Sequence, residues 1–334
     1  MQFPVARVSA AVAALDGERT RWRHLSQTLV GHHGSAALHT LVAGLVDYAG
    51  LFPPAALGMH EAVSNYAEYR SSDDAWMLGR FVVPVSRLSE WKTAVSALDR
   101  RQRASWDGAR LSALLSGEFA SEADEVSSFN AAAPFGVLID VAEGRTGTPD
   151  TVLATAASMP DGVMLYCELP HRDDPLALLH AVRAAGARAQ IRTGGVTPEA
   201  FPAPAEIVRF LRRCFETGVT AKATAGLHHP LRGEFRLTYA PDATLGTMYG
   251  YLNVFLAAAA LRAGASDTVA TAILELTDAS AITISEGSVS VGGVELSVEV
   301  LLAMRSEGVV AFGSCSFREP VDELFTLVRA GERR

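Results

Sequence analysis

Short β-branched runs alternate with longer amphipathic segments through most of the chain, and this rhythm limits the fold more than any other feature. Strands that alternate with helices predict parallel pairing and right-handed crossovers. Eight such units predict a closed α/β fold, the (β/α)8 TIM barrel, and an open doubly wound sheet is the alternative. The expected strands are 46–52, 79–85, 111–116, 135–141, 162–169, 187–193, 219–225 and 309–315. The expected helices between and after them are 59–70, 88–98, 122–132, 149–158, 175–185, 205–217 and 320–329.

Two parts of the chain lie outside this rhythm. Residues 1–45 predict a helical N-terminal extension to a barrel that spans 46–334, and residues 232–308 predict an α+β insertion between the seventh and eighth strands. The insertion is longer than a connection with its helix requires. It is interpreted as a lid or an oligomer contact, with a decorative subdomain as the alternative. The extension predicts helices at 5–15, 20–30 and 36–45, and the insertion predicts helices at 244–264, 267–278 and 296–305 and a hairpin of 281–285 and 288–291.

Composition excludes several classes of protein. The chain carries 29 basic and 37 acidic side chains and a formal charge of −8, which argues against a nucleic-acid-binding protein. Its three cysteines, Cys167, Cys214 and Cys315, lie too far apart in sequence to predict a disulfide framework or a zinc knuckle. The sequence has no apolar run of the length that a membrane helix needs. We therefore expect a cytoplasmic protein with no nucleic-acid or membrane partner.

Charged residues occur inside strands that should be apolar. Because side chains alternate along a strand, Asp47, Asp140, Glu168, Arg192 and Lys222 are all expected to face the barrel interior. In the fourth strand this assignment turns the two neighbours of Asp140, at 139 and 141, outward. Burying unpaired charge is expensive, so the five residues must form a paired cluster. A structural ion-pair layer is one interpretation. The late positions of Glu168, Arg192 and Lys222, near the C-terminal face where barrel active sites form, favour a functional one.

A lysine in this environment suggests specific chemistry. Desolvation lowers the pKa of a buried lysine, and the neutral amine attacks carbonyl carbons. Lys222 is therefore the candidate nucleophile, and an electrostatic clamp for an anionic substrate is its alternative role. Glu168 or Asp140 would move protons. A plain salt bridge between Lys222 and Glu168 is the competing structural interpretation.

Two glycine-rich loops predict anion binding. Arg192-Thr193-Gly194-Gly195 ends the sixth strand, and Gly313-Ser314-Cys315-Ser316 ends the eighth strand just before the last helix. Small residues let backbone N–H groups approach a phosphate or carboxylate, above all before a helix N-terminus. The candidate substrate-binding residues are Asp47, Arg192, Thr193, Gly194, Gly195, Thr224, Gly313, Ser314 and Ser316.

Two adjacent histidines follow the seventh strand. His228 is a candidate general acid or base, because an imidazole titrates near neutral pH. His228, His229 and Glu168, with Asp47 as a further ligand, form the alternative set for a divalent metal ion, since barrel metal sites take histidine and carboxylate ligands. A surface or structural role for both histidines remains the other interpretation.

The last barrel strands resemble the deoxyribose-phosphate aldolase type of class I aldolase. The resemblance lies in residues 191–194, 222–226 and 312–316, which are similar to that family's sixth-strand end, seventh-strand lysine segment and eighth-strand phosphate loop. It implies a barrel with an anion site. The chain departs from the family at Arg192, where the resemblance would place the Schiff-base lysine, so only the assisting lysine, Lys222, is present. Residues 46–54 and 222–230 also resemble an uncharacterised bacterial family, which implies no activity.

These observations predict an enzyme that acts on a small anionic carbonyl compound by aldolase-like lyase or isomerase chemistry. This function uses the Lys/Glu/Arg cluster of the barrel interior and requires no cofactor. A metal-dependent hydrolase or lyase that uses a divalent metal ion is the first alternative. A non-catalytic ligand-binding or scaffold protein is the second. The expected partners are a small anionic substrate and a second copy of the chain.

Overall fold

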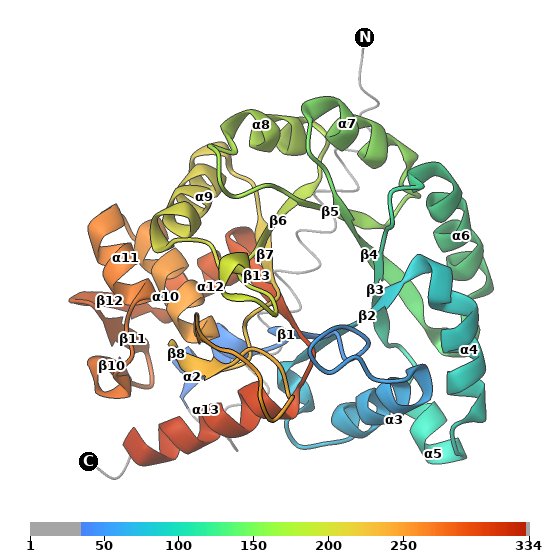
Figure 1. Ribbon diagram of the computed structural model, residues 1–334, viewed down its shortest axis with the longest axis horizontal. Coiled ribbons are helices and arrows are strands. Elements are labelled where there is room, and N and C mark those ends of the chain that lie inside the picture. The colour runs from blue at the N-terminus through green and yellow to red at the C-terminus, as the bar shows by residue number, and fades with distance from the viewer. Residues whose placement is uncertain (1–34, 332–334) are drawn as a thin grey trace.

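The computed structural model describes residues 35–331 and contains a closed barrel of eight parallel strands (Figure 1). The strand order around the barrel is β1-β13-β7-β6-β5-β4-β3-β2, which confirms the predicted (β/α)8 fold. Each predicted strand overlaps one observed strand. The barrel strands are β1 (Val46–Tyr48), β2 (Leu78–Pro84), β3 (Arg110–Leu114), β4 (Leu138–Arg145), β5 (Met164–Glu168), β6 (Arg188–Arg192), β7 (Ala221–Thr224) and β13 (Val309–Ser314).

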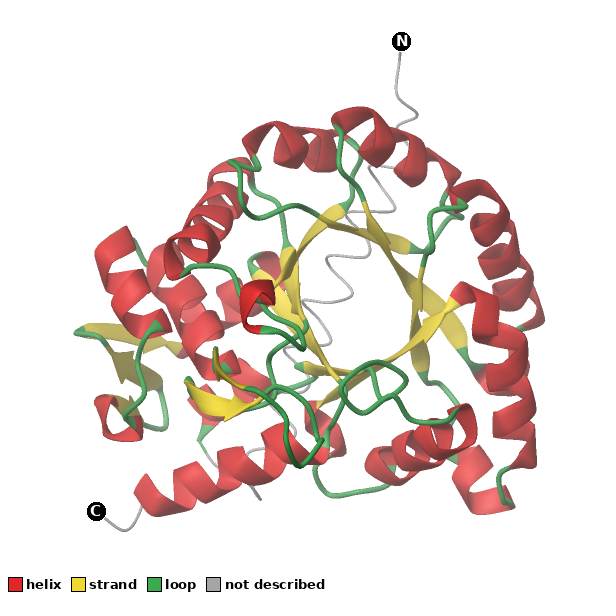
Figure 2. Cartoon of the chain, viewed as in Figure 1, coloured by secondary structure: helices red, strands yellow, loops and turns green. Residues whose placement is uncertain are grey.

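Helices form a ring outside the strands (Figure 2). Their apolar faces pack on the outward side chains of the barrel, and their ends carry ordinary stop and start signals. Thr148 caps the helix that starts at Pro149 by accepting a hydrogen bond from the backbone of Thr151, and Gly218 ends the helix before β7 in a left-handed conformation. The helices of the ring are α3 (Met59–Arg70), α4 (Leu88–Ala97), α6 (Phe119–Ala132), α7 (Pro149–Ser158), α8 (Leu176–Ala184), α9 (Pro204–Thr217) and α13 (Arg318–Gly331). The short helix α5 (Arg100–Ala104) buries none of its residues and lies beside α3.

Of the predicted N-terminal extension, the structure describes only the last helix. This helix, α2 (Ala36–Val42), begins at the capping residue Ser35 and buries Leu38 and Leu41. It packs against α12 (Val298–Glu307), and the backbone N–H of Ala37 donates a hydrogen bond to the carbonyl of Glu286. The helices predicted at 5–15 and 20–30 lie outside the described residues.

The insertion between β7 and β13 is an α+β unit, as expected, but the boundaries of all three of its predicted helices differ from the observed ones. Residues 244–250 are not helical, because β9 (Leu245–Met248) pairs with β8 (Gly233–Arg236) and the helix α10 begins at Tyr251 and ends at Arg262. The predicted hairpin is present as β10 (Ile282–Ile284) and β11 (Ser288–Val291). It gains a third strand, β12 (Val294–Ser297), so α12 starts only at Val298. Helix α11 spans Asp267–Leu274.

Helix α10 makes the insertion part of the barrel wall. Every residue from Tyr251 to Leu261 is buried. Tyr251 stacks on Phe312 of β13 with ring centroids 5.0 Å apart, and α11 and α12 pack on the helix from its other sides. A helix that is apolar all round must be covered all round. The interpretation of the insertion as decoration is therefore wrong for α10. None of the described helices is both long and apolar enough to cross a membrane.

Candidate functional site

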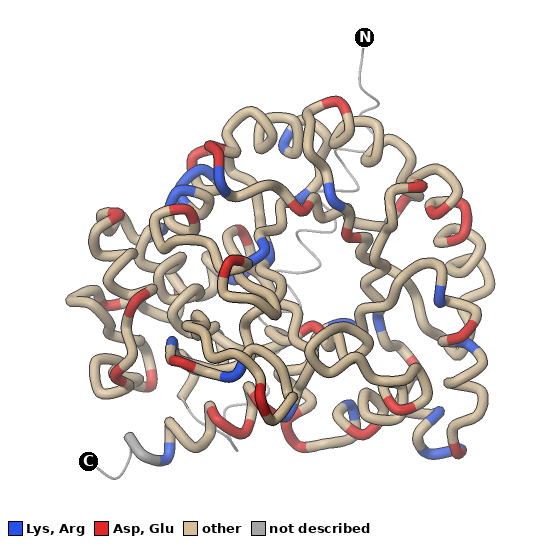
Figure 3. The backbone as a smooth tube through the Cα atoms, in the orientation of Figure 1, with Lys and Arg blue, Asp and Glu red and all other residues tan. Residues whose placement is uncertain are grey.

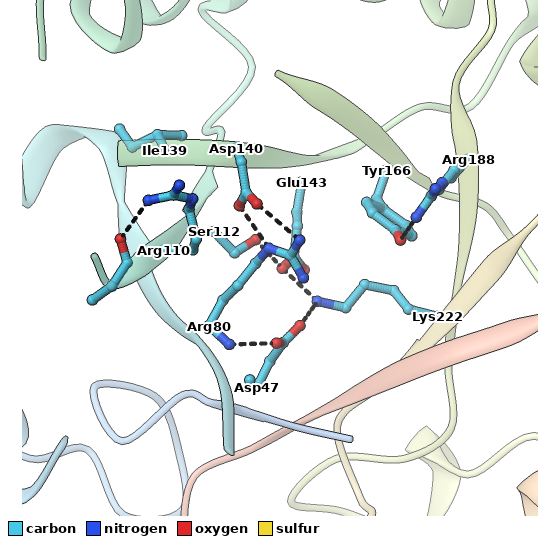
Figure 4. Close-up of polar contacts among 12 residues, drawn as sticks. Asp47, Arg80, Arg110, Ser112, Ile139, Asp140, Glu143, Tyr166, Arg188 and Lys222 are labelled. Carbon is cyan, nitrogen blue, oxygen red and sulfur yellow. Dashed lines mark hydrogen bonds and ion pairs between the residues drawn. The ribbon is translucent and has the colours of Figure 1, made fainter. Parts of the chain in front are cut away.

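A buried lysine forms the centre of the barrel interior. Lys222 Nζ lies 2.7 Å from Asp47 Oδ2 and 2.7 Å from Glu143 Oε1, and Glu143 also accepts a 2.5 Å hydrogen bond from Ser112 Oγ. The side chains of Lys222, Asp47 and Glu143 are 1%, 2% and 3% exposed. Figure 4 shows them pointing toward one another from β7, β1 and β4. Each charge is therefore paired inside the barrel.

A second ion pair joins this cluster from one side. Arg80 donates from Nε and Nη2 to the two carboxylate oxygens of Asp140 at 2.7 and 3.0 Å, and its backbone N–H donates to Asp47 Oδ1 at 2.7 Å (Figure 4). Arg80 and Asp140 lie early in β2 and β4, whereas barrel active sites form at the C-terminal strand ends. The structure thus brings Asp47, Lys222 and Asp140 into one network, but it places Asp140 at the opposite end from a catalytic mouth.

Sequence analysis missed Glu143 because β4 contains a bulge. Residue 111 of β3 is level with Ile139, but Ser112 is level with Val141, so Asp140 is an extra residue on β4. An extra residue reverses the alternation of side chains beyond it. Val141, predicted to pack outward, therefore shares the interior face of Ser112, and so does Glu143. The predicted strand also ended at 141, and no local signal in the sequence marks the bulge.

The pairing keeps Lys222 protonated. Burial alone would lower the pKa of Lys222, but the carboxylates of Asp47 and Glu143 outweigh it and hold that pKa above its ordinary value. Burial would likewise raise the pKa of Asp47, and the charges of Lys222 and Arg80 outweigh it and hold the pKa below its usual range. The expected fall in the lysine pKa is therefore wrong in direction, since the two partner carboxylates are closer than any cation.

A separate charged group lines the C-terminal mouth. Glu168, at the end of β5, accepts hydrogen bonds from Arg145 Nε at 2.9 Å and from Arg192 Nη2 at 3.1 Å. The carboxylate is 14% exposed, and the arginine side chains are 78% and 37% exposed. These three residues, with Thr146, Gly147, Leu169, Pro170 and His171, line a cavity of about 410 Å³. Charged residues along the strands that line the barrel are also visible in Figure 3.

The predicted salt bridge between Lys222 and Glu168 does not form, because each residue is paired elsewhere. Gln190 lies between them in strand register, level with Glu168 on one side and with Lys222 on the other. It is 1% exposed, and its Oε1 has no hydrogen-bond partner among the described residues. The buried network around Lys222 and the charged group around Glu168 are therefore separate. Gln190, with its unpaired Oε1, lies between them.

The predicted loop after β6 is used largely for structure. Thr193 Oγ1 donates a hydrogen bond to the carbonyl of Ala225 at 2.7 Å, which fastens the β6 loop to the β7 loop. Gly226 has a φ of +73°, and a Cβ there would lie 2.7 Å from the Cα of Gly194, so the two loop backbones touch. A Cβ on Gly195 would lie 2.8 Å from the Cβ of Ala200. Only Arg192 of this predicted motif lines the mouth cavity.

The predicted loop after β13 also makes mainly structural contacts. In strand register, Gly313 is level with Asp47 on one side and with Thr224 on the other. A Cβ at position 313 would lie 3.4 Å from Thr224 Oγ1. The carbonyl of Ser314 accepts the backbone N–H of Ala49 at 2.7 Å, and Ser316 Oγ accepts the backbone N–H of Glu319 at the start of α13. The hydroxyl of Ser316 thus occupies one of the helix donors that the predicted phosphate cradle would use.

His228 lies in a group of polar residues between the β7 loop and α13. Its Nδ1 is 3.7 Å from Cys315 Sγ and 3.4 Å from Glu319 Oε2, and Tyr239 Oη lies 3.6 Å from the same sulfur. Burial lowers the pKa of this histidine, but the hydrogen bonds with Cys315 and Glu319 outweigh burial and raise it to about 9. These contacts therefore favour the protonated form of His228. The spacing of the cysteines gave no sign of this contact.

The metal set that combined both histidines with Glu168 is not assembled. Glu168 is engaged by Arg145 and Arg192 at the mouth, whereas His229 Nδ1 lies 2.9 Å from each carboxylate oxygen of Glu323. Within residues 35–329, the group whose ligand atoms lie close enough for one metal ion is His229 with Glu319 and Glu323, all within 4.8 Å of one another. Sequence analysis missed both glutamates, which belong to the last helix.

We expect Lys222→Met to destabilise the fold by about 3–5 kcal/mol, because it leaves Asp47 and Glu143 as unpaired buried carboxylates. The chain has two lysines, and the other, Lys92, is exposed on α4. Lys92→Met is the matched control and should stay within about 0.5 kcal/mol of the parent. Urea unfolding followed by circular dichroism measures both, and equal effects would contradict the interior network.

Asp47→Asn tests the same network through pH. A carboxyl whose folded pKa is depressed adds stability above its ordinary pKa of about 4, and this contribution fades as the pH falls toward the folded value. The stability difference between the parent and Asp47→Asn should therefore be largest at neutral pH and shrink in acid below about pH 4. Asp73→Asn, at an exposed carboxylate, should show no such difference. A gap between parent and Asp47→Asn that is independent of pH would refute the assigned charge state.

Comparisons with known proteins do not assign the chain to a family. A scan against protein-family models finds no match to the chain, and a search of curated proteins finds none either. The functional argument therefore rests on the barrel, on the charged interior and on the residues at its C-terminal face.

Proposed function

We propose that this protein is a barrel enzyme that binds a small anionic carbonyl compound at the C-terminal mouth. The observation that supports the proposal is the pair of arginines, Arg145 and Arg192, on either side of Glu168 in a cavity of about 410 Å³. Two guanidinium groups share one carboxylate, so the group carries net positive charge. The position, at the ends of β4, β5 and β6, is where barrel enzymes hold their substrates.

The chemistry of the mouth favours a carboxylate or phosphate on the substrate. A guanidinium matches the two oxygens of either group with parallel N–H donors. Arg145 is 78% exposed, so its side chain can turn from Glu168 to an incoming anion. Glu168 would then be released as the carboxylate that accepts a proton from the bound compound. Of the three proton carriers expected from sequence, Glu168, Asp140 and His228, Glu168 is the one that lines the cavity.

The paired state of Lys222 favours lyase or isomerase chemistry without a covalent lysine adduct. A neutral amine is needed to attack a carbonyl carbon, and the two carboxylates beside Lys222 hold it as an ammonium. The aldolases that the chain resembles would carry the reactive lysine where Arg192 stands. We therefore assign stabilisation of negative charge on the carbonyl compound to the arginines at the mouth. The buried Lys222 keeps its positive charge in the barrel interior and does not line the mouth cavity.

Arg192→Gln tests anion binding. Loss of a charge-assisted hydrogen-bond pair costs about 1.5–3 kcal/mol, so the dissociation constant should rise about 10- to 100-fold. Titration calorimetry with pyruvate, glyoxylate and dihydroxyacetone phosphate measures it. Arg212→Gln is the control, since Arg212 is about as exposed and pairs with Asp267 away from the cavity lining. The proposal fails if the parent binds none of the three compounds, or if both variants weaken binding equally.

Borohydride reduction tests the role of the lysine. With pyruvate present, we expect no reduced adduct on Lys222, because its amine is buried and protonated. Lys92, the exposed second lysine, reports the background labelling in the same peptide-mapping experiment. A pyruvate-dependent adduct on Lys222 that exceeds the signal on Lys92 would restore Schiff-base chemistry and remove the arginine-based assignment.

A further inference from the structure

Three potential metal ligands converge outside the mouth cavity. His229 comes from the loop after β7, and Glu319 and Glu323 lie four residues apart on α13, so they occupy neighbouring positions on one helix face. One ligand atom from each lies within 4.8 Å of the others. None of the three lines the cavity formed by Arg145, Glu168 and Arg192. This group is therefore independent of the proposed anion site.

The surroundings of His229 hold its ring in a fixed orientation. The ring stacks on Phe235 of β8 with centroids 3.5 Å apart and an interplanar angle of 12°, and the residue is 8% exposed. A histidine ring held by packing presents its nitrogen in one direction, as metal sites require. Here that direction is toward Glu323, whose two oxygens both lie 2.9 Å from Nδ1.

The carboxylates have the freedom to close on an ion. Zinc bonds of about 2.0–2.2 Å place tetrahedral ligand atoms about 3.4 Å apart, so the widest pair here must approach by at most about 1.4 Å. The side chains of Glu319 and Glu323 are 27% and 42% exposed, and rotation about their own bonds covers this distance. His228 Nδ1 lies 3.4 Å from Glu319 Oε2 and can orient that carboxylate, as the outer partners of metal ligands do.

Glu319 and Glu323 lie four residues apart on one helix, so their carboxylates repel each other. His228 and Tyr239 already compensate Glu319, so the relief that a divalent ion adds falls mainly on Glu323. Arg232 lines the adjoining cavity of about 520 Å³, and His229 and Glu323 line it too. The Nε of Arg232 is buried and has no hydrogen-bond partner among the described residues. A ligand in this cavity would meet the histidine–carboxylate group on one wall and a guanidinium on another.

We propose that His229, Glu319 and Glu323 bind one divalent transition-metal ion of the zinc class. One nitrogen and two carboxylate oxygens are a ligand set that zinc accepts, and three protein ligands leave a fourth position open. His229 and Glu323 line the cavity together with Arg232, so an anion bound in this cavity would lie near both the ion and the guanidinium. The ion would also link the loop after β7 to the last helix of the barrel.

Metal titration of the full-length chain tests this proposal without an activity assay. After chelator treatment and dialysis, Zn²⁺ is titrated by calorimetry, and Co²⁺ is added to separate samples to report coordination number through its visible absorption. We expect about one equivalent of Zn²⁺ and the intense bands of four-coordinate cobalt. Glu323→Gln and His229→Gln should each weaken zinc binding by at least about tenfold.

The control removes an equal charge one residue away. Asp322→Asn takes a carboxylate from the same helix turn, but Asp322 pairs with Arg318 and is not one of the three ligands. It should change zinc affinity by less than about twofold. Glu323→Gln alters a half-exposed side chain, so it keeps the test valid if His229→Gln unfolds. Absence of stoichiometric binding in the parent, or equal weakening by Asp322→Asn and Glu323→Gln, overturns the site. Arg192→Gln should leave zinc binding unchanged, which separates this result from the proposed anion site.

Discussion

One buried cation holds the interior of this barrel together. Lys222 reaches from β7 to Asp47 on β1 and to Glu143 on β4, so a single ammonium links three strands that are not neighbours in the barrel. Barrel interiors are normally filled by branched apolar side chains. Replacing those with charges costs desolvation energy that only close and complete pairing offsets. Arg80 extends the pairing by bonding Asp140 and the second oxygen of Asp47.

The need for complete pairing distinguishes the buried charges in the middle of the strands from the partly exposed charges at their C-terminal ends. Because Asp47 and Glu143 pair with Lys222, its amine is held as a cation in the barrel interior and is separate from the charged residues at the strand ends. There Arg145, Arg192 and Glu168 form a partly exposed group with net positive charge. The histidines lie apart from it, against α13. The C-terminal face thus carries two chemically different groups, one suited to anions and one suited to a cation.

Much of the fold was predictable from local pattern. Each of the eight strands and most of the ring helices were placed by hydrophobic periodicity, and α3 and α7 were placed with the observed ends. Asp47 and Lys222 were correctly predicted to face the interior from the alternation of their strands, but their direct pairing was not predicted. Glu143 was missed because the bulge at Asp140 reverses the alternation of β4. The helix predicted from 244 was wrong at its start, because pairing of β8 with β9 overrides local helical preference there.

The sequence by itself determined the repeating βα order, the count of eight units and the presence of charges on interior faces, because these follow from periodicity along the chain. The closure of the eight strands into a barrel, rather than an open sheet, was decided by the tertiary structure. The tertiary structure decided which charges meet. Lys222 pairs with Glu143 and not with Glu168, and the candidate metal ligands are His229, Glu319 and Glu323. Both results arise because the tertiary structure brings together residues that are remote in sequence. Distances across a closed barrel depend on stagger and bulges, and these are properties of paired strands rather than of any one segment.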